Sequence, residues 1–122
     1  MVVPLVVYFF SPRFQFNMRE PFSLVPNGDQ LFIGGGNGQI RIFDLNTYKE
    51  VGVLSGHKTK VGSLFLDGTT LFSGSEDTTL KMWDVPKLAL VNSVDCKENV
   101  RTVRKWHDKI VTMIAPDIWL WE

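Results

Sequence analysis

Short apolar runs alternate with turn residues along the whole chain, and no stretch has the spacing of an amphipathic helix. Apolar side chains at every second position, as at Ile40 and Ile42, are typical of strands that bury one face. Gly, Asp, Asn and Pro separate the runs, for example in the stretch 26–29, PNGD. The pattern predicts strands at 22–25, 31–34, 40–43, 48–54, 61–66, 71–75, 80–83, 88–94, 100–104, 110–114 and 118–121.

These predicted strands recur with a period close to forty residues. The stretch 71–84, LFSGSEDTTLKMWD, aligns with 31–44, LFIGGGNGQIRIFD, and a worn third copy closes the chain at 118–122. A fixed period of this size indicates a repeat architecture, and four short antiparallel strands per repeat correspond to one β-propeller blade. We therefore expect an all-β fold with repeats at 20–55 and 56–95 and a degenerate, incomplete third repeat at 96–122.

The second repeat resembles the WD-repeat β-propeller family, and the resemblance extends over residues 20–122. It is carried at matching spacing by Gly56-His57, Ser73-Gly74-Ser75, Asp77 and Trp83-Asp84. The resemblance implies a partial propeller of four-stranded antiparallel blades. It also implies that one blade is tied together by a hydrogen-bonded network of His57, Ser73, Asp77 and Trp83. Physically, a buried imidazole needs a partner on each nitrogen, which a hydroxyl and a carboxylate supply, and an indole N–H needs an acceptor.

A serine, a histidine and an aspartate also suggest an acyl-transfer triad. A triad needs an exposed nucleophile and an oxyanion hole, however, and the sequence points to neither. The other repeats lose the same positions: opposite His57 stand Asn17 and Cys96, opposite Asp77 stands Asn37, and opposite Trp83 stand Phe43 and Trp121. We therefore expect a structural role, no enzymatic activity, and a whole network in the middle repeat only.

The resemblance further implies that the loop leading into the first strand of a blade lies on the same rim as the turn between its second and third strands. In the middle repeat these loops carry Lys58, Lys60 and Glu76, which are the predicted partner-binding residues. Their mixed charges suit a polar peptide better than a nucleic acid. The predicted function is a non-catalytic scaffold for protein or peptide partners. The alternative is the substrate-recognition part of a ubiquitin ligase or a similar multidomain enzyme.

Composition narrows the class of partner. The 122 residues include 13 basic and 13 acidic side chains, whereas a nucleic-acid binder needs a basic surplus. Lone Cys96 cannot form an internal disulfide, so an intracellular setting, cytoplasmic or nuclear, is expected. The apolar run 1–10, MVVPLVVYFF, is half the length that crosses a bilayer, which takes about 20 residues. Residues 1–19 are thus expected to form a strand and loop, the outer strand of a preceding blade. A ragged terminus and a signal peptide are the alternatives, and no membrane contact is expected.

Two other stretches invite a chemical interpretation. The glycine-rich stretch 34–38, GGGNG, precedes a predicted strand rather than a helix, so a hairpin turn explains it better than a phosphate cradle. The stretch 97–109 holds five basic and two acidic residues, with Arg101, Arg104, Trp106 and His107 among them. A solvated strand edge is the simpler interpretation, and a patch for RNA or phosphopeptide is the alternative. Neither stretch has the spacing of metal ligands, and no metal or cofactor is expected.

The repeat count suggests an open structure. A propeller closes with about four to eight blades, and each blade buries its faces against its neighbours. Two sound repeats and a worn one would leave two terminal faces exposed, with more apolar surface than soluble monomers usually tolerate. We therefore expect either a fragment of a larger propeller or self-association of copies through the open blade faces.

Overall fold

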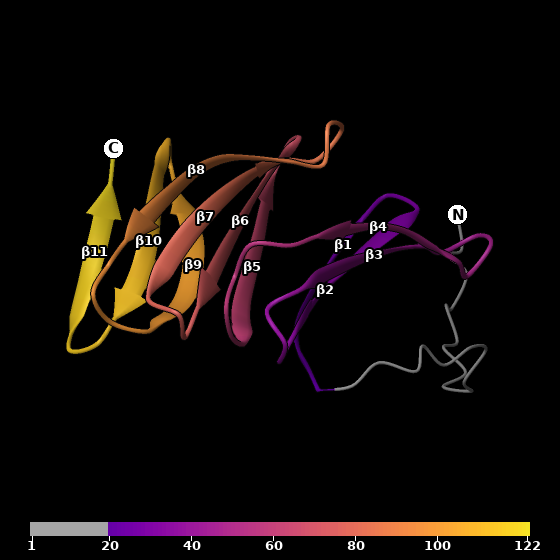
Figure 1. Ribbon diagram of the computed structural model, residues 1–122. Helices are drawn as coiled ribbons and strands as arrows, with labels where there is room; N and C mark the ends of the chain where they lie inside the picture. The colour runs from indigo at the N-terminus through magenta and orange to yellow at the C-terminus, as the bar shows by residue number, and fades with distance from the viewer. Residues whose placement is uncertain (1–19) are drawn as a thin grey trace, which may run out of the picture.

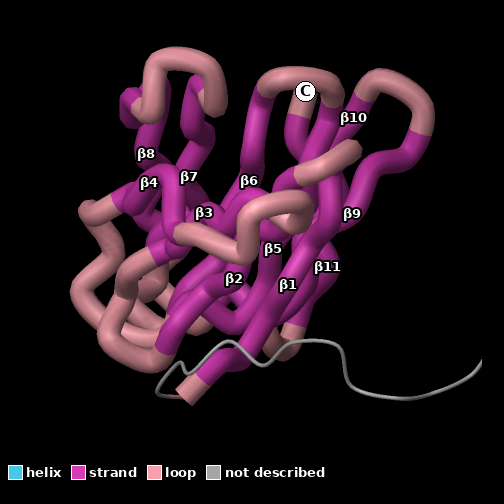
Figure 2. The backbone as a smooth tube through the Cα atoms, turned by 90° about the vertical axis from the view of Figure 1, so that its right-hand side faces the viewer, coloured by secondary structure: helices cyan, strands magenta, loops and turns pink. Residues whose placement is uncertain are grey.

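The computed structural model describes residues 20–122, and every regular element in this range is a strand (Figure 2). The predicted all-β class is confirmed. The strand expected within residues 1–19 lies outside the described residues. The strands are β1 (Pro21–Asn27), β2 (Gln30–Gly35), β3 (Ile40–Asp44), β4 (Glu50–Leu54), β5 (Val61–Asp67), β6 (Thr70–Ser75), β7 (Thr79–Asp84), β8 (Ala89–Asp95), β9 (Val100–Trp106), β10 (Lys109–Ile114) and β11 (Asp117–Trp121).

The strands form three antiparallel sheets that follow one another along the chain (Figure 1). Strands β1 to β4 make blade 1, β5 to β8 make blade 2, and β9 to β11 make blade 3, each paired in chain order. The first strands of the blades contact one another, β1 against β5 and β5 against β9. These three strands are therefore the inner strands of the assembly. Each sheet lies within one predicted repeat, while the boundaries between repeats stay a prediction.

The pairing register repeats from blade to blade. In each blade the pairing between the inner strand and the second strand shifts register near the start of the inner strand. The first pair of residues after this shift is equivalent in the three blades. These equivalent pairs are Ser23 with Gly34, Ser63 with Gly74, and Thr102 with Met113. Positions in different blades can thus be compared by register as well as by sequence spacing.

Apolar side chains gather at the two junctions between blades rather than inside any single sheet. The junction of blades 1 and 2 buries Phe32, Ile40, Ile42, Leu54, Val61, Leu64, Leu71 and Trp83. The junction of blades 2 and 3 buries Phe72, Leu80, Cys96, Val100, Val103 and Ile114. A sheet with one apolar face must bury it against another element, and here each blade supplies that element to its neighbour.

Each junction depends on a glycine. A Cβ atom added at Gly34 would lie 2.8 Å from the carbonyl oxygen of Val61, and one added at Gly74 would lie 2.9 Å from the carbonyl oxygen of Val100. Both positions therefore need a residue without a side chain. Adjacent serines add hydrogen bonds across the junctions. Ser23 Oγ donates to the carbonyl oxygen of Val61 at 2.8 Å, and Ser63 Oγ accepts from the amide of Val103 at 3.0 Å.

Candidate functional site

The structure brings together the four predicted network residues of blade 2. His57 lies in the loop before β5, Ser73 on β6, Asp77 in the β6–β7 turn and Trp83 on β7. The Nδ1 atom of His57 lies 2.9 Å from Asp77 Oδ2, and its Nε2 atom lies 2.6 Å from Ser73 Oγ. Trp83 Nε1 donates to the same Ser73 Oγ at 2.8 Å. A loop, a turn and two strands are therefore joined through side chains alone.

Charge and burial assign the protons in this network. Burial alone would raise the pKa of Asp77, but hydrogen bonds from Thr79, the Lys58 amide and His57 lower it well below its usual range. Burial lowers the pKa of His57 despite the opposing effect of the Asp77 carboxylate. At neutral pH the imidazole is therefore neutral. Its Nδ1–H donates to Asp77, its Nε2 accepts from the Ser73 hydroxyl, and that hydroxyl in turn accepts from Trp83.

Ser73 does not have the surroundings of a nucleophile. Its relative exposure is 0%, and its oxygen is held between the imidazole and the indole. A nucleophile must be reached by its substrate and be adjacent to an oxyanion hole. The connectivity of an acyl-transfer triad is therefore present in a place that no substrate carbonyl reaches.

The other two blades keep different parts of the network. In blade 3, Trp121 Nε1 donates to Thr112 Oγ1 at 2.8 Å, which repeats the Trp83–Ser73 bond. The sequence interpretation missed Thr112, although it follows Ser73 by 39 residues and Trp121 follows Trp83 by 38. In blade 1 the equivalent positions are apolar, namely Ile33 and Phe43, and both are buried. Blade 2 alone combines the hydroxyl–indole bond with a histidine and an aspartate.

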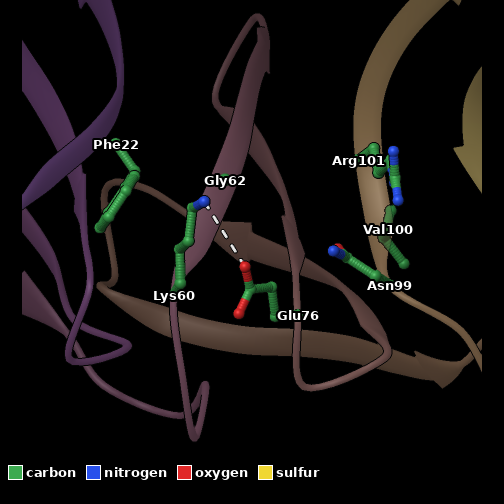
Figure 3. Close-up of a pocket in the computed structure, with 7 residues that line it drawn as sticks. All are labelled: Phe22, Lys60, Gly62, Glu76, Asn99, Val100 and Arg101. Atoms are coloured by element: carbon green, nitrogen blue, oxygen red, sulfur yellow. Dashed lines mark ion pairs between the residues drawn. The ribbon is translucent and has the colours of Figure 1, made fainter.

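The predicted partner-binding residues lie at the rim where the inner strands begin. A hollow of about 400 Å³ at this rim is lined by Phe22, Lys60, Gly62, Glu76, Asn99, Val100 and Arg101 (Figure 3). We call it the rim hollow. Lys60 Nζ lies 3.5 Å from Glu76 Oε1 and 4.1 Å from the centroid of the Phe22 ring, a cation–π contact. Two of the three predicted residues, Lys60 and Glu76, therefore meet in one place.

Lys58 does not line the rim hollow. Its backbone amide donates to Asp77 Oδ2 at 2.9 Å, and the residue is exposed. Its contact with the network is therefore made by the main chain and not by the side chain. Whether Lys58 binds a partner stays a prediction.

The sequence interpretation missed Phe22, Gly62, Asn99 and Val100 as lining residues, and it named Arg101 only within the stretch 97–109. The forty-residue period contained the signal for them. Phe22, Gly62 and Arg101 occupy equivalent repeat positions, as do Lys60 and Asn99. Because equivalent positions of successive blades begin the inner strands, they converge at one rim, as Figure 3 shows for blades 2 and 3.

The rim hollow presents mixed chemistry. Glu76 offers a carboxylate, Asn99 an amide and Arg101 a guanidinium that forms no ion pair within residues 20–122. Phe22 and the stem of Lys60 add apolar surface. Such a lining can hold a short polar peptide by hydrogen bonds and charge, with one apolar contact.

No helix within residues 20–122 is long and apolar enough to cross a membrane. No group of three or more His, Cys, Asp or Glu side chains in this range is arranged to hold a metal ion. Cys96 is buried at the junction of blades 2 and 3, and burial raises the pKa of its thiol.

Comparison with known proteins gives one matching family model, described as "WD domain, G-beta repeat", over residues 48–84. WD repeat-containing protein 1 of Xenopus tropicalis is 36% identical over 84 residues, which is 60% of this chain and 14% of that protein. The Protein LST8 homolog of Dictyostelium discoideum is 35% identical over 80 residues, 62% of this chain and 26% of that protein. Mouse Pre-mRNA-processing factor 19 is 30% identical over 81 residues, 65% of this chain and 16% of that protein. The chain thus spans between 14% and 26% of these relatives.

Solved structures show the same fold. The β-propeller domain of Cps50 (Swd1) from Myceliophteria thermophila matches with a TM-score of 0.82 at 21% identity, over 89% of this chain and 37% of that one. The computationally designed Ika4 protein matches with a TM-score of 0.73 at 21% identity, over 80% of this chain and 62% of that one. Identities this low concern the fold alone, and they confirm the predicted blades of a β-propeller.

Proposed function

This chain belongs to the WD-repeat β-propeller family, and from that premise we propose that it is a non-catalytic scaffold that binds a peptide segment of a protein partner in the rim hollow. The observation that carries the proposal is the convergence of Phe22, Lys60 and Arg101, one from each blade, on a single hollow. Family membership supports a protein-interaction role in general, while the site and the peptide chemistry rest on this geometry.

The charges of the rim hollow define the segment that fits it. Glu76 is already partly neutralised by Lys60 at 3.5 Å, whereas Arg101 forms no ion pair within the described residues. An acidic side chain on the peptide would therefore find its best partner in Arg101 through a charge-assisted hydrogen bond. The amide of Asn99 and the ring of Phe22 lie beside these charges and would contact the neighbouring peptide groups.

Hydrogen bonds within blade 2 fix the two loops that form this site. Asp77 accepts from the Lys58 amide, and Ser75 Oγ donates to the carbonyl oxygen of Lys60 at 2.8 Å. The Glu76 amide also donates to the carbonyl oxygen of Lys60 at 3.1 Å. Both rim loops are thus held before a partner arrives, and a preorganised site loses less conformational entropy on binding.

The relatives bear several different names, and this chain spans only a small part of each. Their partners are therefore not transferred to it. An intracellular setting is part of the proposal, because it agrees with the single, buried Cys96. The alternative, a substrate-recognition part of a ubiquitin ligase, stays a prediction.

The test uses a phage-displayed library of random dodecapeptides selected on the full chain. Selected peptides should carry an acidic residue, and Arg101→Glu should weaken their binding about tenfold or more, as a lost charge-assisted bond implies. Glu76→Lys should change which peptides are selected. The matched control is Lys87→Glu in the β7–β8 turn at the opposite rim. Equal weakening by Lys87→Glu, or none by Arg101→Glu, would contradict the proposal.

A further inference from the structure

The two junctions between blades share a pair of small residues that the open face of blade 3 lacks. Blade 1 presents Ser23 and Gly34 to blade 2, and blade 2 presents Ser63 and Gly74 to blade 3. At the same register, blade 3 has Thr102 paired with Met113. A long side chain therefore stands where both existing junctions need a glycine.

The distances show how strict this need is. A Cβ atom added at Gly74 would lie 2.7 Å from Val100 Cγ1 and 2.9 Å from the Val100 carbonyl oxygen. Two of the three nearest atoms belong to the side chain of a buried valine and one to its backbone, so no flexible chain end can move aside. Methionine has three heavy atoms beyond Cβ. A further blade cannot stack on blade 3 in the geometry of the first two junctions.

The open face of blade 3 differs from those of blades 1 and 2 at a second position, where it carries a charge. In blades 1 and 2, three apolar residues paired across the first three strands face the next blade. They are Val25, Phe32 and Ile42 in blade 1, and Phe65, Phe72 and Met82 in blade 2, and all six pack in the junction clusters. The equivalent residues of blade 3 are Arg104, Val111 and Leu120. Arginine thus replaces an apolar residue where the next blade would bury it.

The rest of the face is apolar and exposed. The relative exposures of Met113, Ile118 and Leu120 are 47%, 72% and 52%. Met113 pairs with Ile118, and Val111 with Leu120, so the four side chains lie on one side of the sheet. We call Arg104, Val111, Met113, Ile118 and Leu120 the blade 3 face.

We propose that the blade 3 face binds an amphipathic helix of a protein partner, with apolar side chains against Met113, Ile118 and Leu120 and a carboxylate against Arg104. Apolar side chains that are exposed side by side on one sheet face mark interaction sites. A helix packs on a sheet through interposed side chains, so it needs no glycine. The occupant is therefore a helix and not a further blade.

Charge complementarity selects an acidic helix. Within residues 20–122 the guanidinium of Arg104 forms no ion pair, and its Nη1 donates to the carbonyl oxygen of Val103 at 2.7 Å. The nearby cation Lys109 already has carboxylates, with Asp108 at 3.3 Å and Glu122 at 3.8 Å. Arg104 is thus the unmatched charge of this face. The blade 3 face and the rim hollow are separate surfaces, because they share no residue.

The same geometry bears on self-association. Stacking the inner strand of a second copy on blade 3 would press its backbone against Met113, as a further blade would. Association of copies in that register is therefore disfavoured, and the self-association expected from the sequence would have to use other contacts.

The test titrates the full chain into two fluorescein-labelled synthetic helices of 18 residues, followed by anisotropy. Both peptides carry one stripe of leucines, and beside that stripe one has glutamates and the other lysines. The wild-type chain should bind the glutamate helix about tenfold more tightly, as one charge-assisted contact implies. Arg104→Glu should reverse this preference, and Ile118→Asp should weaken both helices. Lys87→Glu, in the exposed β7–β8 turn, is the matched control and should leave both affinities unchanged.

Thermal unfolding of each variant checks that the fold persists, and Arg104→Glu and Lys87→Glu are exposed changes expected to retain it. Equal binding of the two helices by the wild-type chain would overturn the proposal, as would an unchanged preference in Arg104→Glu. Sedimentation supplies the competing outcome. If the wild-type chain forms oligomers that Met113→Glu dissociates, the blade 3 face takes a second copy of the chain and the proposal is wrong.

Discussion

Trp121 donates its indole N–H to the hydroxyl of Thr112 at 2.8 Å, in the blade whose sequence repeat is most worn. The equivalent indole of blade 2 makes the same bond to Ser73. Cys96 occupies the repeat position of His57, so in blade 3 no histidine from that position bonds to the hydroxyl of Thr112. The hydroxyl–indole bond and the histidine–aspartate pair are thus two separable parts of one network.

The first prediction compares the indoles. Trp83 is 2% exposed, whereas Trp121 is only half-buried. We expect Trp83→Ala to lower the free energy of unfolding by about 3–5 kcal/mol and Trp121→Ala to lower it by less. Urea titration followed by circular dichroism measures both. Trp106→Ala, at an exposed indole, is the control and should change stability by about 0.5 kcal/mol or less. A larger loss of stability from Trp121→Ala than from Trp83→Ala would contradict the importance given to blade 2.

The second prediction is a loss of stability in acid. Burial lowers the pKa of His57 below 6.5, so as pH falls through 6.5 the unfolded chain takes up a proton that the folded chain does not. Hydrogen bonds lower the pKa of Asp77 despite its burial, so a second loss begins below about 3.8, the ordinary carboxyl value. Both contributions are complete above about pH 7 and decrease as pH falls.

Urea titrations between pH 4.5 and 7.5 isolate the histidine step. The wild-type chain should lose stability towards pH 4.5, with a slope of at most about 1.4 kcal/mol per pH unit from this one group. His57→Gln should flatten the slope, while the control His107→Gln, at an exposed histidine in the β9–β10 turn, should keep it. Stability that rises on acidification would refute the proton assignment.

The third prediction concerns the glycine at the second junction. Gly74→Ala places a methyl group against the side chain and carbonyl of Val100, and we expect a cost of about 1–3 kcal/mol from overpacking. Gly62→Ala is the matched control, since the nearest atom to its added Cβ is Lys60 Cε at 4.0 Å. Amide exchange should show the Gly74→Ala loss in β9 and β10 first. A neutral Gly74→Ala would show that the junction relaxes freely, and it would also weaken the argument from Met113.

The fourth prediction is chemical inertness of Ser73. Because its hydroxyl is fully buried and bonded to both His57 and Trp83, a fluorophosphonate probe should not label it in the folded chain. Mass spectrometry of the treated protein measures this directly. A covalent adduct at Ser73 under native conditions would restore the hydrolase hypothesis.

The forty-residue period allowed much of this protein to be predicted from its sequence. Strand alternation such as Ile40 and Ile42 marks which side of a sheet is apolar, and the glycine and asparagine turns mark where strands end. Repetition then compensates for weak local signals, because a strand that is ambiguous in one repeat is clear in another. For the same reason His57, Ser73, Asp77 and Trp83 could be proposed as partners from spacing and hydrogen-bonding needs.

Contacts between blades were decided only by the tertiary structure. That Gly74 touches Val100, that Phe22 and Arg101 share the rim hollow with Lys60, and that Met113 occupies a glycine position all depend on how one sheet lies against the next. The alternation of apolar and polar residues shows which face of a strand is buried, because each position needs an apolar or a polar side chain according to its own exposure to water. It does not record distances across a junction, since these arise from the packing of two complete sheets.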